Sequence, residues 1–126
     1  MNDKARVLII DDQEGIRGLL DEICLVMGYQ TVTACSGVNA LAMAACEIVA
    51  GNDIKVAFVD MKMPGLSGLD TLKGIHALNP NIKIYLMTGF AEDSLSGDAI
   101  KYGACGIIPK PFSLEKIKEI LEMTFS

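Results

Sequence analysis

The chain has 126 residues, of which 51% are hydrophobic, and a formal net charge of −5 at pH 7. This length suits one domain with a sizeable core, and the acidic balance argues against nucleic acid as a direct partner, since phosphate binding needs a basic face. No uncharged apolar stretch approaches the roughly 18 residues of a membrane span. The first ten residues also lack the small-residue cleavage site of a signal peptide. We therefore expect a cytoplasmic protein that does not bind membranes.

Five apolar runs alternate with five helical patterns, which is typical of a parallel α/β sheet. The runs predict strands at residues 6–10, 31–35, 54–59, 82–87 and 105–108. Helices are predicted near residues 13–27, 38–50, 67–78 and 91–102, with a last one after Ser113. Right-handed crossovers give a flavodoxin-like, doubly wound (βα)5 three-layer sandwich. The strand order 2-1-3-4-5 does not follow from spacing alone, but it brings the acidic ends of strands one and three together.

The first and last helices each have an apolar face. Residues at helical spacing predict one buried face on the first helix: Ile16, Leu19, Leu20, Ile23 and Met27. On the last helix the buried face is predicted to be Ile117, Ile120 and Leu121. Ser36 and Ser113 are expected to be N-caps, and Gly28 is expected to end the first helix. The helix near 91–102 has few apolar anchors and is therefore the weakest of the five.

The cysteines and the histidine suggest no metal site. Cys24, Cys35, Cys46 and Cys105 form no CxxC pair, and His76 is the only histidine. Free cysteine commonly packs as a small hydrophobic residue. We expect buried, reduced thiols of a cytosolic protein rather than a zinc site, and His76 is expected on a helix surface.

Polar residues follow four of the predicted strands. Asp11 and Asp12 follow the first, Asp60 the third, Thr88 the fourth and Lys110 the fifth. Each alone has a simpler interpretation, because an aspartate can cap a helix, a threonine can occupy a turn and a lysine can be solvated. Together they reach one edge of one sheet, where open α/β sheets bind ligands.

The charges of these strand ends favour a particular chemistry. Three carboxylates and one lysine give a formal charge of −2 in a confined site, which is costly unless a cation neutralises it. Mg²⁺ prefers oxygen ligands and shares phosphate oxygens with substrates. A phosphoryl group would meet metal, ammonium and hydroxyl groups there. The chain lacks GxxxxGKS/T and GxGxxG, but a carboxylate can itself become an aspartyl phosphate.

Four motifs, VLIIDDQ, VDMKMPGLSG, YLMTG and IIPKPF, occur in this order along the chain. Together they resemble the receiver domain of bacterial two-component response regulators, from Val7 to about the C-terminus. The residues of these motifs look closest to those of stand-alone phosphorelay receivers of the sporulation type, although receivers fused to output domains share much of the pattern. The resemblance implies one response regulatory domain over residues 1–126. The sequence leaves no room for an output domain after the last helix, and a stand-alone relay protein and a receiver excised from a longer protein would look identical here.

The resemblance also implies a role for each strand end. Asp60 would accept a phosphoryl group from a phosphohistidine on a sensor histidine kinase or histidine phosphotransfer protein. Asp12 resembles the direct Mg²⁺ ligand and Asp11 a ligand acting largely through water, while the backbone carbonyl of Lys62 would complete the protein's metal ligands.

Two further roles come from the same resemblance. Thr88 resembles the switch hydroxyl that turns toward the phosphoryl group, and Lys110 resembles its ion-pair partner. The family pattern also suggests a cis bond between Lys110 and Pro111, which is chemically plausible only before proline.

Three positions need separate interpretation. Lys62 either influences the lifetime of the acyl phosphate or is merely solvated. Gly89 leaves the site open where the family usually has a small side chain. Ile107 stands where many receivers carry an aromatic switch residue, so a phosphorylation-driven shift would run through Thr88 and the weak fourth helix.

Two other functions stay open from the sequence. One is a Mg²⁺-dependent phosphatase on a related scaffold, although such enzymes often need an aspartate where Lys62 stands. The other is a degenerate receiver that acts only as a binding module. For the leading hypothesis, the partner would dock on the first helix and nearby loops, with Gly15 and Ile16 as candidate contacts.

Overall fold

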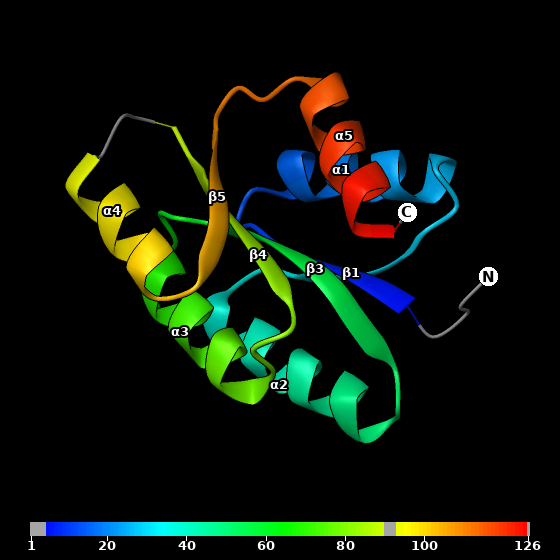
Figure 1. Cartoon of the computed structure of the whole chain (residues 1–126), viewed down its shortest axis with the longest axis horizontal. Helices are drawn as coiled ribbons and strands as arrows, with labels where there is room; N and C mark the ends of the chain where they lie inside the picture. The colour runs from blue at the N-terminus through cyan, green and yellow to red at the C-terminus, as the bar shows by residue number, and fades with distance from the viewer. Residues whose placement is uncertain (1–4, 90–92, 126) are drawn as a thin grey trace.

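The computed structural model describes residues 5–89 and 93–125, in which strands and helices alternate (Figure 1). The strands are β1 (Ala5–Ile10), β2 (Gln30–Ala34), β3 (Asp53–Asp60), β4 (Lys83–Thr88) and β5 (Ala104–Pro109). The helices are α1 (Glu14–Val26), α2 (Gly37–Val49), α3 (Gly68–Leu78), α4 (Asp93–Lys101) and α5 (Leu114–Phe125). Every predicted strand is confirmed to within one residue at each end, and residues 91 and 92 of the predicted fourth helix lie outside the described residues.

The five strands form one parallel sheet in the order β2-β1-β3-β4-β5. The predicted flavodoxin-like order is therefore confirmed. Helices α1 and α5 cover one face of the sheet and α2, α3 and α4 cover the other (Figure 1). Within the described ranges, no helix combines the length and apolar character needed to cross a lipid bilayer.

The central strand β3 is buried on both faces. Ala57 and Val59 belong to the core beneath α2 and α3, whereas Val56 and Phe58 belong to the core beneath α1 and α5. This alternation follows from the two-residue repeat of a strand, and burial on both faces explains its nearly continuous apolar run. Edge strand β2 is less buried, as its alternating sequence predicted.

Local signals at the helix ends behave as predicted. Ser36 Oγ accepts a hydrogen bond from Asn39 N at 3.1 Å, and Ser113 Oγ accepts one from Lys116 N at 3.1 Å. Gly28 follows the C-cap of α1 with φ 89°, a conformation that favours glycine. The predicted buried face of α5 is also confirmed.

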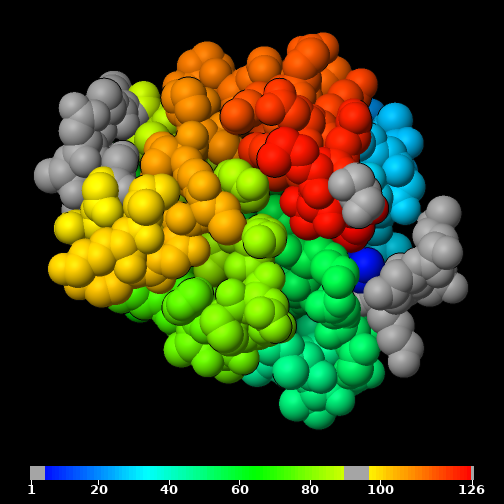
Figure 2. Space-filling view, in the orientation of Figure 1, coloured from blue at the N-terminus to red at the C-terminus, as the bar shows by residue number. Residues whose placement is uncertain are grey.

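Two predictions about burial are wrong in part. Leu19 is 47% exposed rather than buried, because it lies at the margin of an α1 face that is formed by Leu20, Ile23 and Cys24. All four cysteines are free, but only Cys24 is buried. The exposed thiols are on edge strand β5, on α2 and just after edge strand β2, where one side meets solvent: Cys105, Cys46 and Cys35. Figure 2 shows β5 at the surface between α4 and α5.

His76 is only partly a surface residue. Its side chain is half-buried, and its buried Nδ1 has no hydrogen-bond partner among the described residues. The ring lies beneath Gly103, where an added Cβ would be 2.7 Å from Nδ1. The missing side chain at Gly103 thus makes room for the histidine.

Candidate functional site

Asp60 is the last residue of β3 and is 5% exposed. The backbone around it is tied to two neighbouring elements. Met61 N donates to Met87 O of β4 at 2.8 Å, and Gly68 N at the start of α3 donates to Met61 O at 3.1 Å. The carboxylate predicted as the centre of the site is therefore held on the carboxyl edge of the sheet by β4 and α3.

Asp11 and Asp12 follow the neighbouring strand β1, whose Ile10 pairs with Val59 of β3. Asp11 is fully buried and Asp12 is exposed. Asp11 Oδ1 accepts a hydrogen bond from Gln13 N at 2.9 Å. Gln13 itself occupies the N-cap position of α1 without a side-chain capping bond. Asp11 thus orders the loop before the helix.

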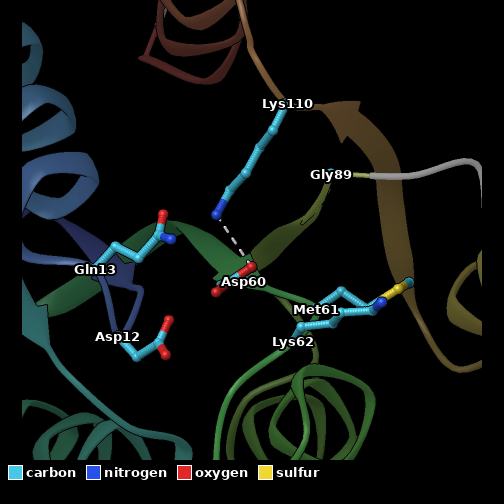
Figure 3. Close-up of a pocket in the computed structure, with 7 residues that line it drawn as sticks. All are labelled: Asp12, Gln13, Asp60, Met61, Lys62, Gly89 and Lys110. Carbon is cyan, nitrogen blue, oxygen red and sulfur yellow. Dashed lines mark hydrogen bonds and ion pairs between the residues drawn. The ribbon is translucent and has the colours of Figure 1, made fainter.

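Lys110 reaches the same place from β5. Its Nζ lies 3.1 Å from Asp60 Oδ1 (Figure 3). The same Nζ lies 2.8 Å from Asp11 Oδ2. The peptide bond between Lys110 and Pro111 is cis, which confirms the prediction. Although burial lowers the pKa of Lys110, hydrogen bonds to Asp11 and Asp60 raise it above its ordinary value overall. The lysine is therefore a stable cation between two buried carboxylates.

Thr88 ends β4 and is 6% exposed. It pairs with Pro109 of β5, and its carbonyl oxygen accepts a hydrogen bond from Lys110 N at 2.6 Å. The threonine thus belongs to the same strand edge as the lysine, as the sequence predicted.

A cavity of about 210 Å³ lies in front of Asp60. It is lined by Asp12, Gln13, Asp60, Met61, Lys62, Gly89 and Lys110 (Figure 3). An added Cβ at Gly89 would meet no atom within 4 Å, so this side of the cavity is open as predicted. Lys62 does reach the cavity, whereas Gln13 was not singled out from the sequence.

The carboxylates provide a donor set that suits a hard divalent cation. Oxygens of Asp11, Asp12 and Asp60 lie within 4.8 Å of one another, and one exposed and two buried carboxylates can share an ion that keeps part of its water shell. Lys110 offsets only one of the three negative charges. The residues present therefore fit Mg²⁺, both in ligand type and in charge.

The pKa of Asp60 reflects this crowding. Burial raises the pKa to about 6 from its ordinary value of 3.8, the charge of Asp11 adds to the effect, and hydrogen bonding to Lys110 opposes it. Ionisation of Asp60 therefore costs more free energy in the folded protein than in the unfolded chain, although the carboxylate still predominates at neutral pH.

This pKa predicts how stability changes with pH. Because the folded-state pKa is raised, the contribution of Asp60 to stability is fully present below pH 4 and is lost as the pH rises through 6. The Asp60→Asn variant has no charge to bury, so it should exceed the wild type in unfolding free energy by about 1 to 3 kcal/mol at pH 8. Urea unfolding in EDTA from pH 4 to 8 measures this.

The difference should vanish at pH 4, and added Mg²⁺ should reduce it at pH 8. Asp53→Asn is the matched control, since Asp53 begins the same strand but has a side chain 43% exposed and paired with Lys55. A difference between Asp60→Asn and wild type that did not change with pH would contradict the prediction.

The fold and the acidic edge of the sheet are those of a receiver module, and the family comparison agrees. Residues 7–122 match the model of the response regulator receiver domain, and the chain belongs to this family. Receiver domains are phosphoacceptor modules of two-component signalling rather than classical enzymes, so the functional class predicted from the sequence is confirmed.

Individual relatives agree with this assignment. The chain is 35% identical to sporulation initiation phosphotransferase F of Bacillus subtilis, over 97% of this chain and 93% of that protein. It is 32% identical to the transcriptional regulatory protein ZraR of Salmonella typhimurium, over 94% of this chain but only 26% of that protein. A receiver domain protein from Clostridium thermocellum superposes with a TM-score of 0.85 at 28% identity, covering 95% and 93% of the two chains.

Proposed function

We propose that Asp60 accepts a phosphoryl group from a phosphohistidine of a sensor kinase or histidine phosphotransfer protein. The observation that carries this proposal is the position of Lys110 Nζ, which contacts both Asp11 and Asp60 beside an open cavity. Such an arrangement combines a nucleophilic carboxylate with a fixed positive charge, as phosphoryl transfer requires. Because the histidine donor carries phosphate obtained from ATP by a kinase, we also propose a cytoplasmic location.

The transfer exchanges one bond to phosphorus for another. A carboxylate oxygen of Asp60 forms a bond to phosphorus while the bond between phosphorus and the histidine nitrogen breaks, and the electron pair leaves with that nitrogen. Lys110 favours the ionised nucleophile through its hydrogen bond to Asp60. In the same place, the ammonium group can balance negative charge on the phosphoryl oxygens.

Mg²⁺ is the cofactor that the donor set favours, with Asp11, Asp12 and Asp60 as its side-chain ligands. When bound, it supplies positive charge to the phosphoryl oxygens. Asp11 already accepts hydrogen bonds from Gln13 N and Lys110 Nζ, which supports a role through water, whereas exposed Asp12 is better suited to bind directly. We propose the carbonyl of Lys62 as a further ligand.

The response to phosphorylation is proposed to involve Thr88 and α4. Thr88 ends the strand that leads toward α4, and its carbonyl binds the backbone of Lys110. In α4, Ala99 is buried whereas Ile100 is 52% exposed. Ile107 packs against the core instead of presenting an aromatic ring. The proposed shift of α4 would therefore depend on the Thr88 hydroxyl and not on the movement of an aromatic side chain at position 107.

The partner surface is proposed on the first half of α1. Gly15 is exposed and Ile16 is half-buried beside the loop that carries Asp12 and Gln13. Leu19, which the sequence placed in the core, is exposed one turn further along the helix. An apolar strip next to the cavity suits a helix that carries a phosphohistidine.

The test compares a small donor with a protein donor. With acetyl phosphate and Mg²⁺, wild type should gain an acid-stable, hydroxylamine-sensitive label that Asp60→Ala lacks and Asp53→Ala retains. Leu19→Arg should keep this labelling but lose roughly tenfold or more in transfer rate from a phosphohistidine protein, because a central interface residue is replaced. Labelled Asp60→Ala would refute the phosphoacceptor assignment, and unchanged transfer to Leu19→Arg would refute the docking surface.

A further inference from the structure

Arg17 of α1 contacts the acidic loop through the backbone rather than through a carboxylate. Its Nη1 donates a hydrogen bond to the carbonyl oxygen of Asp11 at 2.8 Å. The half-buried side chain also lines a cavity of about 170 Å³ between α1 and β2, together with Glu14 and Asp21. Within the described part of the chain Arg17 forms no ion pair with either acid. The Asp11 carbonyl is thus the partner that fixes its guanidinium group.

Asp11 is held at four of its atoms. Its N donates to Ala34 O at 3.2 Å, its Oδ1 accepts from Gln13 N and its Oδ2 accepts from Lys110 Nζ. The bond from Arg17 to the carbonyl oxygen completes the set. That carbonyl belongs to the peptide that joins Asp11 to Asp12. Arg17 therefore fixes the plane from which the exposed Asp12 side chain extends toward the cavity.

We propose that Arg17 is a positioning residue for the divalent-cation site, which it orders by holding the Asp11–Asp12 peptide. The inference rests on the proposed function, in which the two aspartates bind Mg²⁺. Charge alone would act in the opposite direction, since a nearby arginine repels a cation and its loss should tighten Mg²⁺ binding. Positioning predicts that its loss weakens Mg²⁺ binding, so the sign of the change separates the two effects.

The test uses the full chain and its two arginines. Arg17→Met keeps the aliphatic stem but removes the donors. Arg6→Met is the matched control, because Arg6 Nη1 donates to the Ala5 carbonyl at 3.1 Å at the other end of β1. Both variants lose one positive charge. Mg²⁺ titration followed by NMR should give about tenfold weaker binding for Arg17→Met, as for other residues that orient metal ligands, and a dissociation constant within about twofold of wild type for Arg6→Met.

A second readout does not need the metal. The ¹⁵N shift of the Asp12 amide reports on the peptide that Arg17 holds, and it should change in metal-free Arg17→Met but not in Arg6→Met. If Arg17→Met does not fold, Arg17→Gln replaces it with the same expectations. Equal or tighter Mg²⁺ binding, an unchanged Asp12 shift, or equal weakening in Arg6→Met would each overturn the inference. Wild type that binds no Mg²⁺ would instead refute the proposed function, while the metal-free shift would still decide whether Arg17 orders the peptide.

Discussion

Replacing Gly68 by alanine is expected to destabilise the protein by about 3 kcal/mol and to reduce labelling of Asp60 by more than tenfold. An ideal Cβ at Gly68 would lie 2.2 Å from the carbonyl oxygen of Asp60 and 2.6 Å from Cα of Met61. Both atoms belong to the backbone, so no side-chain rotation can relieve the overlap. Either α3 must move away or the end of β3 must shift, and the second change displaces the carboxylate that we propose as the nucleophile.

Urea unfolding and the initial rate of labelling by acetyl phosphate measure the two effects. Gly18→Ala is the matched control, because Gly18 is also helical but an added Cβ there meets no atom within 4 Å. The free energy of unfolding of Gly18→Ala should equal that of the wild type or exceed it by up to about 1 kcal/mol, since alanine favours helix. If Gly68→Ala kept the unfolding free energy and the labelling rate of the wild type, the start of α3 would not constrain Asp60.

Replacing Lys110 by methionine is expected to produce the other large effect. Its ammonium lies between Asp11, which is fully buried, and Asp60, so its loss leaves two close carboxylates without their cation. Removal of one partner from a buried ion pair costs about 3 kcal/mol or more. The loss of a fixed charge beside the proposed nucleophile should also lower the labelling rate by roughly a hundredfold.

The destabilisation by Lys110→Met should depend on pH and be larger at pH 8 than at pH 5, because protonation of Asp60 relieves the repulsion. Lys55→Met is the matched control, since Lys55 and Asp53 form an ion pair at 2.7 Å with side chains 42% and 43% exposed. An exposed pair of this kind is worth less than about 1 kcal/mol. Equal losses of stability in the two variants would contradict a special role for Lys110. Stability is measured in EDTA and labelling with Mg²⁺.

Much of the candidate site could be predicted because the apolar pattern of the sequence and the topology of the sheet depend on the same buried strands. The apolar run before Asp60 indicates a central strand, and parallel strands bring their carboxyl ends to one edge. Asp11, Asp60 and Lys110 could therefore be placed together before any contact was known. The structure adds that Lys110 contacts both aspartates directly.

Other features depend on details that a pattern does not contain. Helical spacing shows the direction of an apolar face but not its width, so Leu19 was assigned to the core. Cys105 is exposed on edge strand β5 where the pairing with β4 passes over it, since Ile84 pairs with Ala104 and Tyr85 with Gly106, and such a register shift is not visible in the sequence. Gln13 lines the cavity from a loop and Arg17 contacts the Asp11 carbonyl from α1, and in both cases the path of the backbone decides what the side chain reaches. Neither residue type signals such a role in sequence.

The contact between Lys110 and Asp11 joins residues 99 positions apart. During synthesis, the aspartates of β1 and β3 emerge long before the lysine that neutralises part of their charge. A nascent or partly unfolded chain in which β5 has not docked lacks this cation, so the carboxylates at the ends of β1 and β3 repel one another. We therefore expect the proposed phosphoryl acceptance to begin only once β5 has docked, so that it would also report that the five-stranded sheet is complete.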